Sequence, residues 1–109
     1  KLVFPTDHGD EMNLLEVSKE IAKRLISIFE KDAEGKRPVN GDEVIYQYES
    51  PFNNLVLFYE YFHGDNARGV GASHQTGWTG VVAELINCVA KLENESKKKM
   101  SGARLSPVN

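Results

Sequence analysis

Residues 55–62 read LVLFYEYF, and Glu60 is the only member of this run that is neither apolar nor aromatic. If the run is helical, its apolar side chains cover every direction around the axis, which is typical of a helix buried on all sides. We therefore expect a buried helix from Pro51 to about Phe62, with Ser50 as its N-cap. Burying a carboxylate without partners costs several kcal/mol, so Glu60 is either paired structurally or kept for a function.

The composition is that of one small soluble domain. The chain has 109 residues, of which 40% are hydrophobic and 27% are charged, and its net charge is −3. The mildly acidic balance argues against nucleic acid as a partner, and no apolar run approaches the ~20 residues needed to span a bilayer. We therefore expect neither a nucleic-acid nor a membrane partner. No secretory pattern precedes the domain, which favours a cytoplasmic location.

Two further helices are expected. Apolar residues recur at steps of three and four between Asn13 and Glu30, which predicts an amphipathic helix. Its expected buried face is made of Leu14, Val17, Ile21, Leu25 and Ile28. Asn13 followed by Glu16 predicts a capping box. A third helix is expected from about Thr76–Thr79 to Glu93, with residues 94–109 as a disordered tail.

The segments between these helices contain turn signals, and no convincing strand pair is found. Residues 44–46 read VIY and could form one short extended piece. Residues 63–77, HGDNARGVGASHQTG, predict a loop with tight turns and varied polar side chains. Cys88 is expected to be a buried small hydrophobe, because it lies within the apolar pattern of the third helix.

The candidate chemistry gathers around this loop. His8, His63 and His74 match no zinc-binding spacing, so no metal site is predicted, and no phosphate-binding motif indicates a cofactor. Trp78 is either a core residue or an aromatic that stacks on a sugar ring. An all-apolar helix in so short a chain indicates that more protein, from its own chain or a partner, completes the core.

The segment Leu55–Ala83, LVLFYEYFHGDNARGVGASHQTGWTGVVA, resembles the C-terminal segment of glycoside hydrolase family 63, the processing α-glucosidase I-like enzymes. The stretch FPTDHGDEMNL and the DAEGKRPVNG loop agree in order, so that the resemblance covers most of residues 4–92. Residues 42–53 fit this family less well. The resemblance implies an all-α fold, in which residues 1–93 are the C-terminal part of an (α/α)6 barrel with about three helices.

The resemblance also implies a reaction. Members of the family hydrolyse α-linked sugars with inversion of the anomeric configuration, and they use a general acid and a general base. The resemblance implies that the glutamate of the motif, here Glu60, is the base. The general acid is expected upstream of this chain, on none of Asp7, Asp10, Asp42 or Asp65. His63, His74, Gln75 and Trp78 are expected to line the sugar site, where an α-linked oligosaccharide or glucoside binds. The chain alone, which holds half of the site, is expected to have no turnover.

Two other interpretations stay open at this point. The chain could be a non-catalytic helical module that binds carbohydrate or docks on other proteins, with the apolar surface of residues 55–62 promoting association. It could instead be a small structural all-α protein without a cleft. The glycosidase interpretation requires one further partner, which is the remainder of the catalytic domain.

Overall fold

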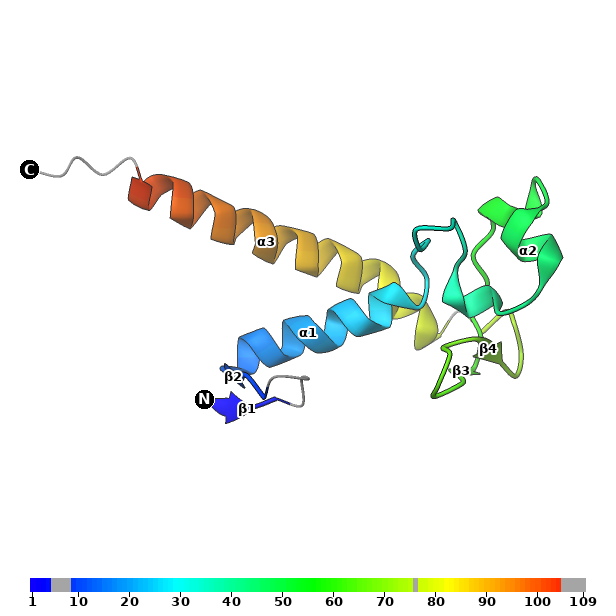
Figure 1. Ribbon diagram of the computed structural model, residues 1–109, viewed down its shortest axis with the longest axis horizontal. Coiled ribbons are helices and arrows are strands. Elements are labelled where there is room, and N and C mark those ends of the chain that lie inside the picture. The colour runs from blue at the N-terminus through cyan, green and yellow to red at the C-terminus, as the bar shows by residue number, and fades with distance from the viewer. Residues whose placement is uncertain (5–8, 76, 105–109) are drawn as a thin grey trace, which may run out of the picture.

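The computed structural model describes residues 1–4, 9–75 and 77–104, with only the backbone of Arg104. Two long helices, α1 (Leu14–Ser27) and α3 (Val82–Arg104), run antiparallel, lie together at one end and diverge toward the other (Figure 1). Beyond their joined end lies a smaller unit of loops, short helices and a hairpin. The short elements are β1 (Leu2–Val3), β2 (Glu11–Met12), η1 (Pro38–Asn40), α2 (Val44–Tyr48), η2 (Phe52–Asn54), β3 (Tyr61–Phe62), β4 (Gly69–Val70) and η3 (Thr79–Val81).

The predicted all-α barrel fragment is wrong. The structure contains two antiparallel strand pairs, β1 with β2 and β3 with β4, beside the helices. The predicted helix from Pro51 to Phe62 is absent. Only Phe52–Asn54 forms a 3-10 turn, and the chain is extended or bent from Leu55 to Phe62. Because Val, Phe and Tyr favour extended backbone, an apolar run of this length suits a strand as well as a helix.

The start of α1 is as predicted. Asn13 is the N-cap, its side chain accepts a hydrogen bond from the Glu16 N–H at 2.9 Å, and the Glu16 carboxylate accepts from the Asn13 N–H at 2.8 Å. This reciprocal capping box satisfies two backbone donors that a helix start leaves without partners. The first residue of the helix is therefore determined locally, whatever the helix packs against.

The face that α1 buries differs from the predicted one. Leu14 is 73% exposed and Leu25 is 40% exposed, whereas Ala22 and Ile26 are buried and face the inside with Phe29. The helix has two adjacent apolar stripes, and α3 covers the stripe one position further along the chain. On the predicted stripe, Leu14, Ile21 and Leu25 are exposed, whereas Val17 and Ile28 are half-buried.

The core lies where α1, α3 and the hairpin meet. It consists of Ile26, Phe29, Val39 and Val82, with partly buried Ile28, Phe58, Tyr59, Phe62, Leu85 and Val89 packed around it. The Phe29 ring contacts both hairpin aromatics, with ring centroids 5.9 Å from Phe58 and 5.6 Å from Phe62. These contacts join the helix pair to the unit that contains Glu60.

The loop before α2 is held by one buried glutamine. The Gln47 Oε1 accepts a hydrogen bond from the Arg37 N–H at 2.9 Å, and its Nε2 donates to the carbonyls of Arg37 and Gly41. Gln47 lies on α2, which forms where a short extended piece was expected at residues 44–46. The five-residue helix α2 thus fixes the conformation of the loop that precedes it.

The third helix begins close to its predicted start, after the turn η3, and continues beyond Glu93 through residues 94–104, which the sequence had assigned to the tail. The division into 1–93 and 94–109 itself stays a prediction, and residues 105–109 lie outside the described part. Cys88 is exposed and not buried as expected, and its thiol donates to the Glu84 carboxylate at 3.4 Å. That hydrogen bond raises the pKa of the Cys88 thiol.

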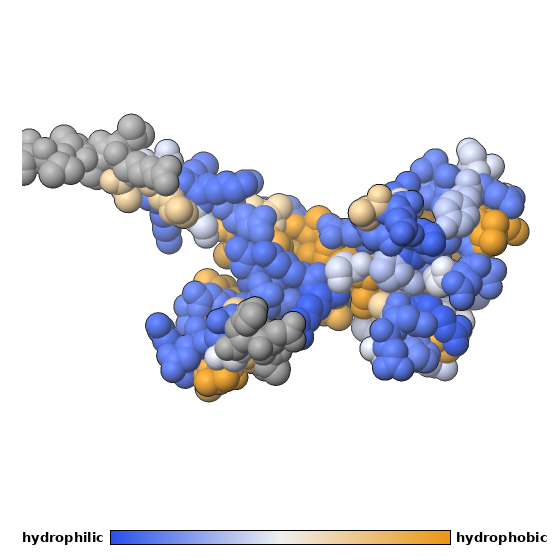
Figure 2. Space-filling view, viewed as in Figure 1, coloured by the Kyte–Doolittle hydropathy of each residue, from blue (hydrophilic) through white to orange (hydrophobic). Residues whose placement is uncertain are grey.

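The chain leaves much apolar surface open. Its accessible surface is 8161 Å², whereas a folded monomer of 12.2 kDa has roughly 6,100 Å². Its radius of gyration is 17.8 Å, against about 13 Å for a compact domain of this length. Hydrophobic side chains reach the surface near the junction of the two helices (Figure 2). No helix in the described ranges is long and apolar enough to cross a membrane.

The observed face of α1 predicts an asymmetry between two substitutions. Ile26→Ala removes buried side-chain atoms at the seam with α3 and should lower the free energy of unfolding by about 2–4 kcal/mol. Leu14→Ala, at a position that is mostly exposed, should change it by less than about 1 kcal/mol. Urea titrations followed by circular dichroism measure both values. A larger loss for Leu14→Ala would show that the originally predicted face is the buried one.

Candidate functional site

Glu60 lies on a hairpin, just before β3. Strand β3 pairs with β4 so that Tyr61 is opposite Val70 and Phe62 is opposite Gly69. The pairing extends past the strands, because the Glu60 N–H donates to the Ala72 carbonyl at 3.1 Å. The turn between the strands is closed by hydrogen bonds from the Ala67 N–H to the His63 carbonyl and from the His63 N–H to the Arg68 carbonyl.

The carboxylate of Glu60 is exposed, and it is held at one oxygen. Its Oε2 accepts a hydrogen bond from the Ala72 N–H at 3.0 Å. Within the described residues, its Oε1 has no hydrogen-bond partner, and neither oxygen forms an ion pair. The run is extended, and Glu60 lies at its exposed edge. A backbone donor, and not a cation, orients the group.

Two glycines on the opposite strand make room for Tyr59 and Glu60. A Cβ at Gly71 would collide with the Glu60 carboxylate, and Gly71 has a φ of +82°, which favours glycine. A Cβ at Gly69 would collide with the Tyr59 ring. The Gly69-Val70-Gly71 sequence therefore serves as a flat surface on which one aromatic ring and one carboxylate lie.

His74 and Gln75 follow β4 and lie beside Phe58. The backbone of His74 forms an isolated bridge with Phe58, and the Gln75 N–H donates to the Phe58 carbonyl at 2.7 Å. Both side chains are exposed. The structure thus brings the backbones of these two predicted site residues to within two positions of Glu60. No hydrogen bond or ion pair in the described part of the chain joins their side chains to the Glu60 carboxylate.

Trp78 and His63 lie at the other end of β3. The Trp78 ring meets the edge of Phe62 with a centroid distance of 6.1 Å, and it is 59% exposed. It lines a small apolar pocket of about 70 Å³ together with residues of α1 and α3. His63 is exposed, and its Nδ1 accepts a hydrogen bond from the Asp65 N–H at 3.3 Å. The imidazole therefore contacts the backbone of the turn that follows it.

A polar cleft of about 290 Å³ lies on the Tyr59 side of the hairpin. It is lined by Val39, Asn40, Gly41, Asp42, Glu43, Tyr59, Arg68 and Gly69. Partial burial, and then the charges of Tyr46 and Glu43, raise the pKa of the Tyr59 hydroxyl. This cleft was not predicted from the sequence, because its two parts, residues 39–43 and residues 59–69, lie 16 positions apart in the chain and only the folded hairpin brings them together.

The described residues contain no group of three or more His, Cys, Asp or Glu side chains placed to hold a metal ion. His8, the third histidine considered for such a site, lies outside those residues. His63 lies in the turn after β3, where its Nδ1 accepts a hydrogen bond from the Asp65 N–H, and His74 lies four residues after β4.

The residues that position Glu60 were only partly visible in the sequence. The sequence interpretation gives Gly69, Gly71 and Ala72 backbone freedom in a loop and places Tyr59 in a buried helix. A usable signal exists, because an aromatic-Glu-aromatic stretch faces a Gly-x-Gly stretch across a short polar turn. That pattern indicates a hairpin in which glycines accommodate the larger residues opposite.

The Gly71 contact predicts a cost for adding one methyl group. Gly71→Ala introduces a Cβ at positive φ and against the Glu60 carboxylate, so we expect a loss of about 1–3 kcal/mol in the free energy of unfolding. Gly64→Ala is the control, since no heavy atom lies within 4 Å of a Cβ there, and it should change stability by less than about 0.5 kcal/mol. If urea titrations gave equal losses of unfolding free energy for Gly71→Ala and Gly64→Ala, the close contact between Gly71 and the Glu60 carboxylate would be contradicted.

The raised pKa of Tyr59 predicts a loss of stability in alkali. The folded state prefers the neutral phenol, so this contribution is fully present below the unfolded pKa of about 10 and is lost as pH rises through the higher folded pKa. Tyr59→Phe should therefore lose less stability than the wild type between about pH 9 and pH 11. Tyr61→Phe, at a position more than half exposed, is the control. Parallel curves for wild type and Tyr59→Phe would exclude the effect.

No family model and no solved structure matches the chain. The chain is similar to the uncharacterized protein YMR196W of Saccharomyces cerevisiae, with 44% identity over 91 residues. The match covers 82% of this chain and 8% of the yeast protein. The chain therefore spans less than a tenth of the length of the curated relative that it matches.

Proposed function

We propose that this chain is part of an inverting α-glycosidase, to which it contributes the general base, Glu60. The observation that carries the proposal is the state of the carboxylate. One oxygen is fixed by the Ala72 N–H, and the other has no hydrogen-bond partner among the described residues and lies at an exposed edge. A general base needs this combination, because it must be oriented and must also reach the water that it deprotonates.

The proposal requires additional protein. Inversion needs a general acid about 6.5–9.5 Å from the base, on the other side of the sugar ring. The proposal places that acid on the remainder of the catalytic domain and not on Asp10, Asp42 or Asp65 of this chain. The yeast relative supports a longer polypeptide, because more than nine-tenths of it lies outside the matched part. The excess accessible surface of this chain supports the same conclusion.

The substrate in this proposal is an α-linked oligosaccharide or glucoside. Trp78 offers an exposed aromatic face for the apolar side of a sugar ring, and His63, His74 and Gln75 offer exposed polar groups on the same hairpin. The polar cleft beside Tyr59 supplies further hydrogen-bonding groups.

The rival function is a non-catalytic interaction module. It is favoured by the number of large hydrophobic side chains that are exposed on α1 and α3, including Leu14, Leu15, Ile21, Leu25 and Ile86. An interaction module would use these surfaces and would not need the Glu60 carboxylate. Substitution of Glu60 therefore separates the two functions.

The test is a charge-removing, nearly isosteric substitution in the full-length enzyme that the proposal implies. Glu60→Gln should lower the rate of α-glucoside hydrolysis by about 100- to 10,000-fold, because water loses its general base. Glu49→Gln, at an exposed glutamate outside the hairpin, should leave the rate unchanged. Proton NMR of the first product should show the β-anomer, as inversion requires.

Two results would overturn the assignment. Near-normal hydrolysis by Glu60→Gln would remove Glu60 from the reaction. Clear turnover by the 109-residue chain alone, abolished by Glu60→Gln, would show that the general acid lies within this chain and that the proposed division of the site is wrong.

A further inference from the structure

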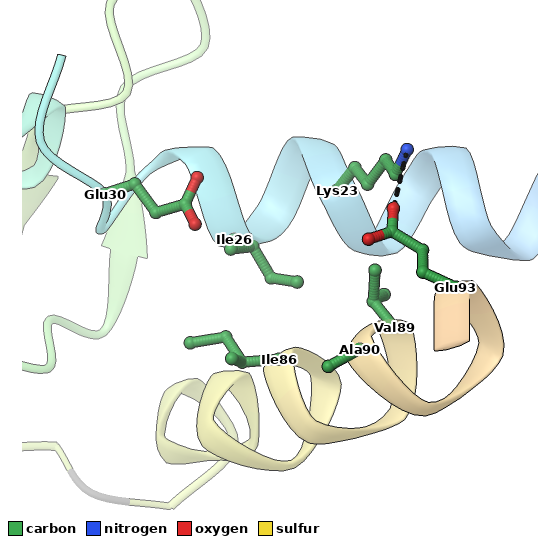
Figure 3. Close-up of a pocket in the computed structure, with 7 residues that line it drawn as sticks. All are labelled: Lys23, Ile26, Glu30, Ile86, Val89, Ala90 and Glu93. Atoms are coloured by element: carbon green, nitrogen blue, oxygen red, sulfur yellow. Dashed lines mark ion pairs between the residues drawn. The ribbon is translucent and has the colours of Figure 1, made fainter. Parts of the chain in front are cut away.

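A groove runs along one side of the junction between α1 and α3. Its volume is about 400 Å³, and its lining is apolar along the middle and charged at both ends. Figure 3 shows Ile26 from α1 and Ile86, Val89 and Ala90 from α3 facing the space between the helices. Lys23 and Glu93 close one end as an ion pair of 3.3 Å, and Glu30 lies at the other end.

The groove lies on a face of the helix pair that no second layer of the described structure covers. Two packed helices bury only the seam between them, and a stable domain covers the remaining apolar faces with a second layer. Ile86 is 47% exposed although it lines the groove. The accessible surface of the whole chain exceeds that of a compact monomer of its mass by about 2,000 Å².

The two ends of the groove differ in charge. At one end Glu93 accepts from Lys23 and lies 3.9 Å from Lys19, so its charge is offset. At the other end Glu30 forms no ion pair with any described residue, and it lies three positions after Ser27, the last residue of α1. The Arg37 guanidinium already donates to the Phe29 carbonyl at this end of the helix. The exposed Glu30 carboxylate leaves a negative charge in the groove, which attracts a second cation.

We propose that the groove seats an amphipathic helix from polypeptide that adjoins this segment in a longer protein. The apolar side chains of that helix pack on Ile26, Ile86 and Ala90, and a lysine or arginine faces Glu30. The yeast relative supports this occupant over a second copy, because most of its polypeptide lies outside the matched segment and is available for packing. The groove follows α1 from Lys23 to Glu30, about 10 Å, which accommodates two turns of a helix.

The test compares access to the groove in two contexts. The contexts are the 109-residue chain and a chimera in which this chain replaces the matching segment of the yeast relative. Ala90→Cys, combined with Cys88→Ser, places one thiol of this segment in the groove. Maleimide labelling at position 90, measured by peptide mass spectrometry, should be at least about tenfold slower in the chimera. A second pair of proteins, which keep Ala90 and native Cys88, is the control for reagent access, because Cys88 lies on another face of α3.

Either of two results overturns the proposal. Equal labelling of position 90 in both contexts means that nothing covers the groove. Slow labelling in the isolated chain, becoming faster on dilution, means that a second copy is the occupant. The readout is labelling and not hydrolysis, so that the result does not depend on whether Glu60 is a base.

The charge part of the proposal has its own variant. In the Ala90→Cys chimera, Glu30→Lys places two cations together and should speed labelling severalfold. Glu95→Lys, on the exposed part of α3 outside the groove, should not change the rate. Unchanged labelling with Glu30→Lys would exclude a basic residue opposite Glu30. Circular dichroism of each variant in the 109-residue chain checks that α1 and α3 still form.

Discussion

The packing of the Phe29 ring is the contact on which the rest of the structure depends. This ring, just past the end of α1, touches Phe58 and Phe62 of the hairpin and belongs to the buried cluster with Val39 and Val82. Three segments far apart in sequence therefore meet on one side chain. The backbone near Phe29 is fixed as well, because its carbonyl accepts from Arg37 and the Ile28 carbonyl accepts from the Val39 N–H. Without this cluster, the hairpin that contains Glu60 would have no fixed relation to the helices.

The parts of the fold that could be predicted are those that local interactions decide. The capping box of Asn13 and Glu16 determines where α1 begins, and its residues are three apart in sequence. The predicted buried face of α1 failed because the helix has two adjacent apolar stripes, and only the position of α3 selects between them. Periodicity indicates that a helix has an apolar side, and it does not say which neighbour covers it.

The run at residues 55–62 was assigned to the wrong element for a different reason. An apolar stretch of eight residues fits both a buried helix and a strand, and the choice depends on what pairs with it. Here the partner is the Gly69–Gly71 stretch, whose glycines accept the Tyr59 ring and the Glu60 carboxylate. The identity of Glu60 as the residue of interest was available from the sequence, but its exposure and its Ala72 hydrogen bond followed only from the hairpin.

This chain determines the orientation of the Glu60 carboxylate, but it does not determine the polarity of the carboxylate's surroundings. The orientation of the carboxylate is intrinsic, since the Ala72 donor and the Gly71 surface lie within twelve residues of it. The polarity around the free oxygen is not, because the aromatic side of the hairpin and the open faces of α1 and α3 are uncovered in the described structure. A carboxylate acts more strongly on water when neighbouring protein excludes bulk solvent. Protein that covers these apolar faces would therefore complete the core, and only protein that also encloses the Glu60 edge of the hairpin would lower the polarity around this oriented carboxylate.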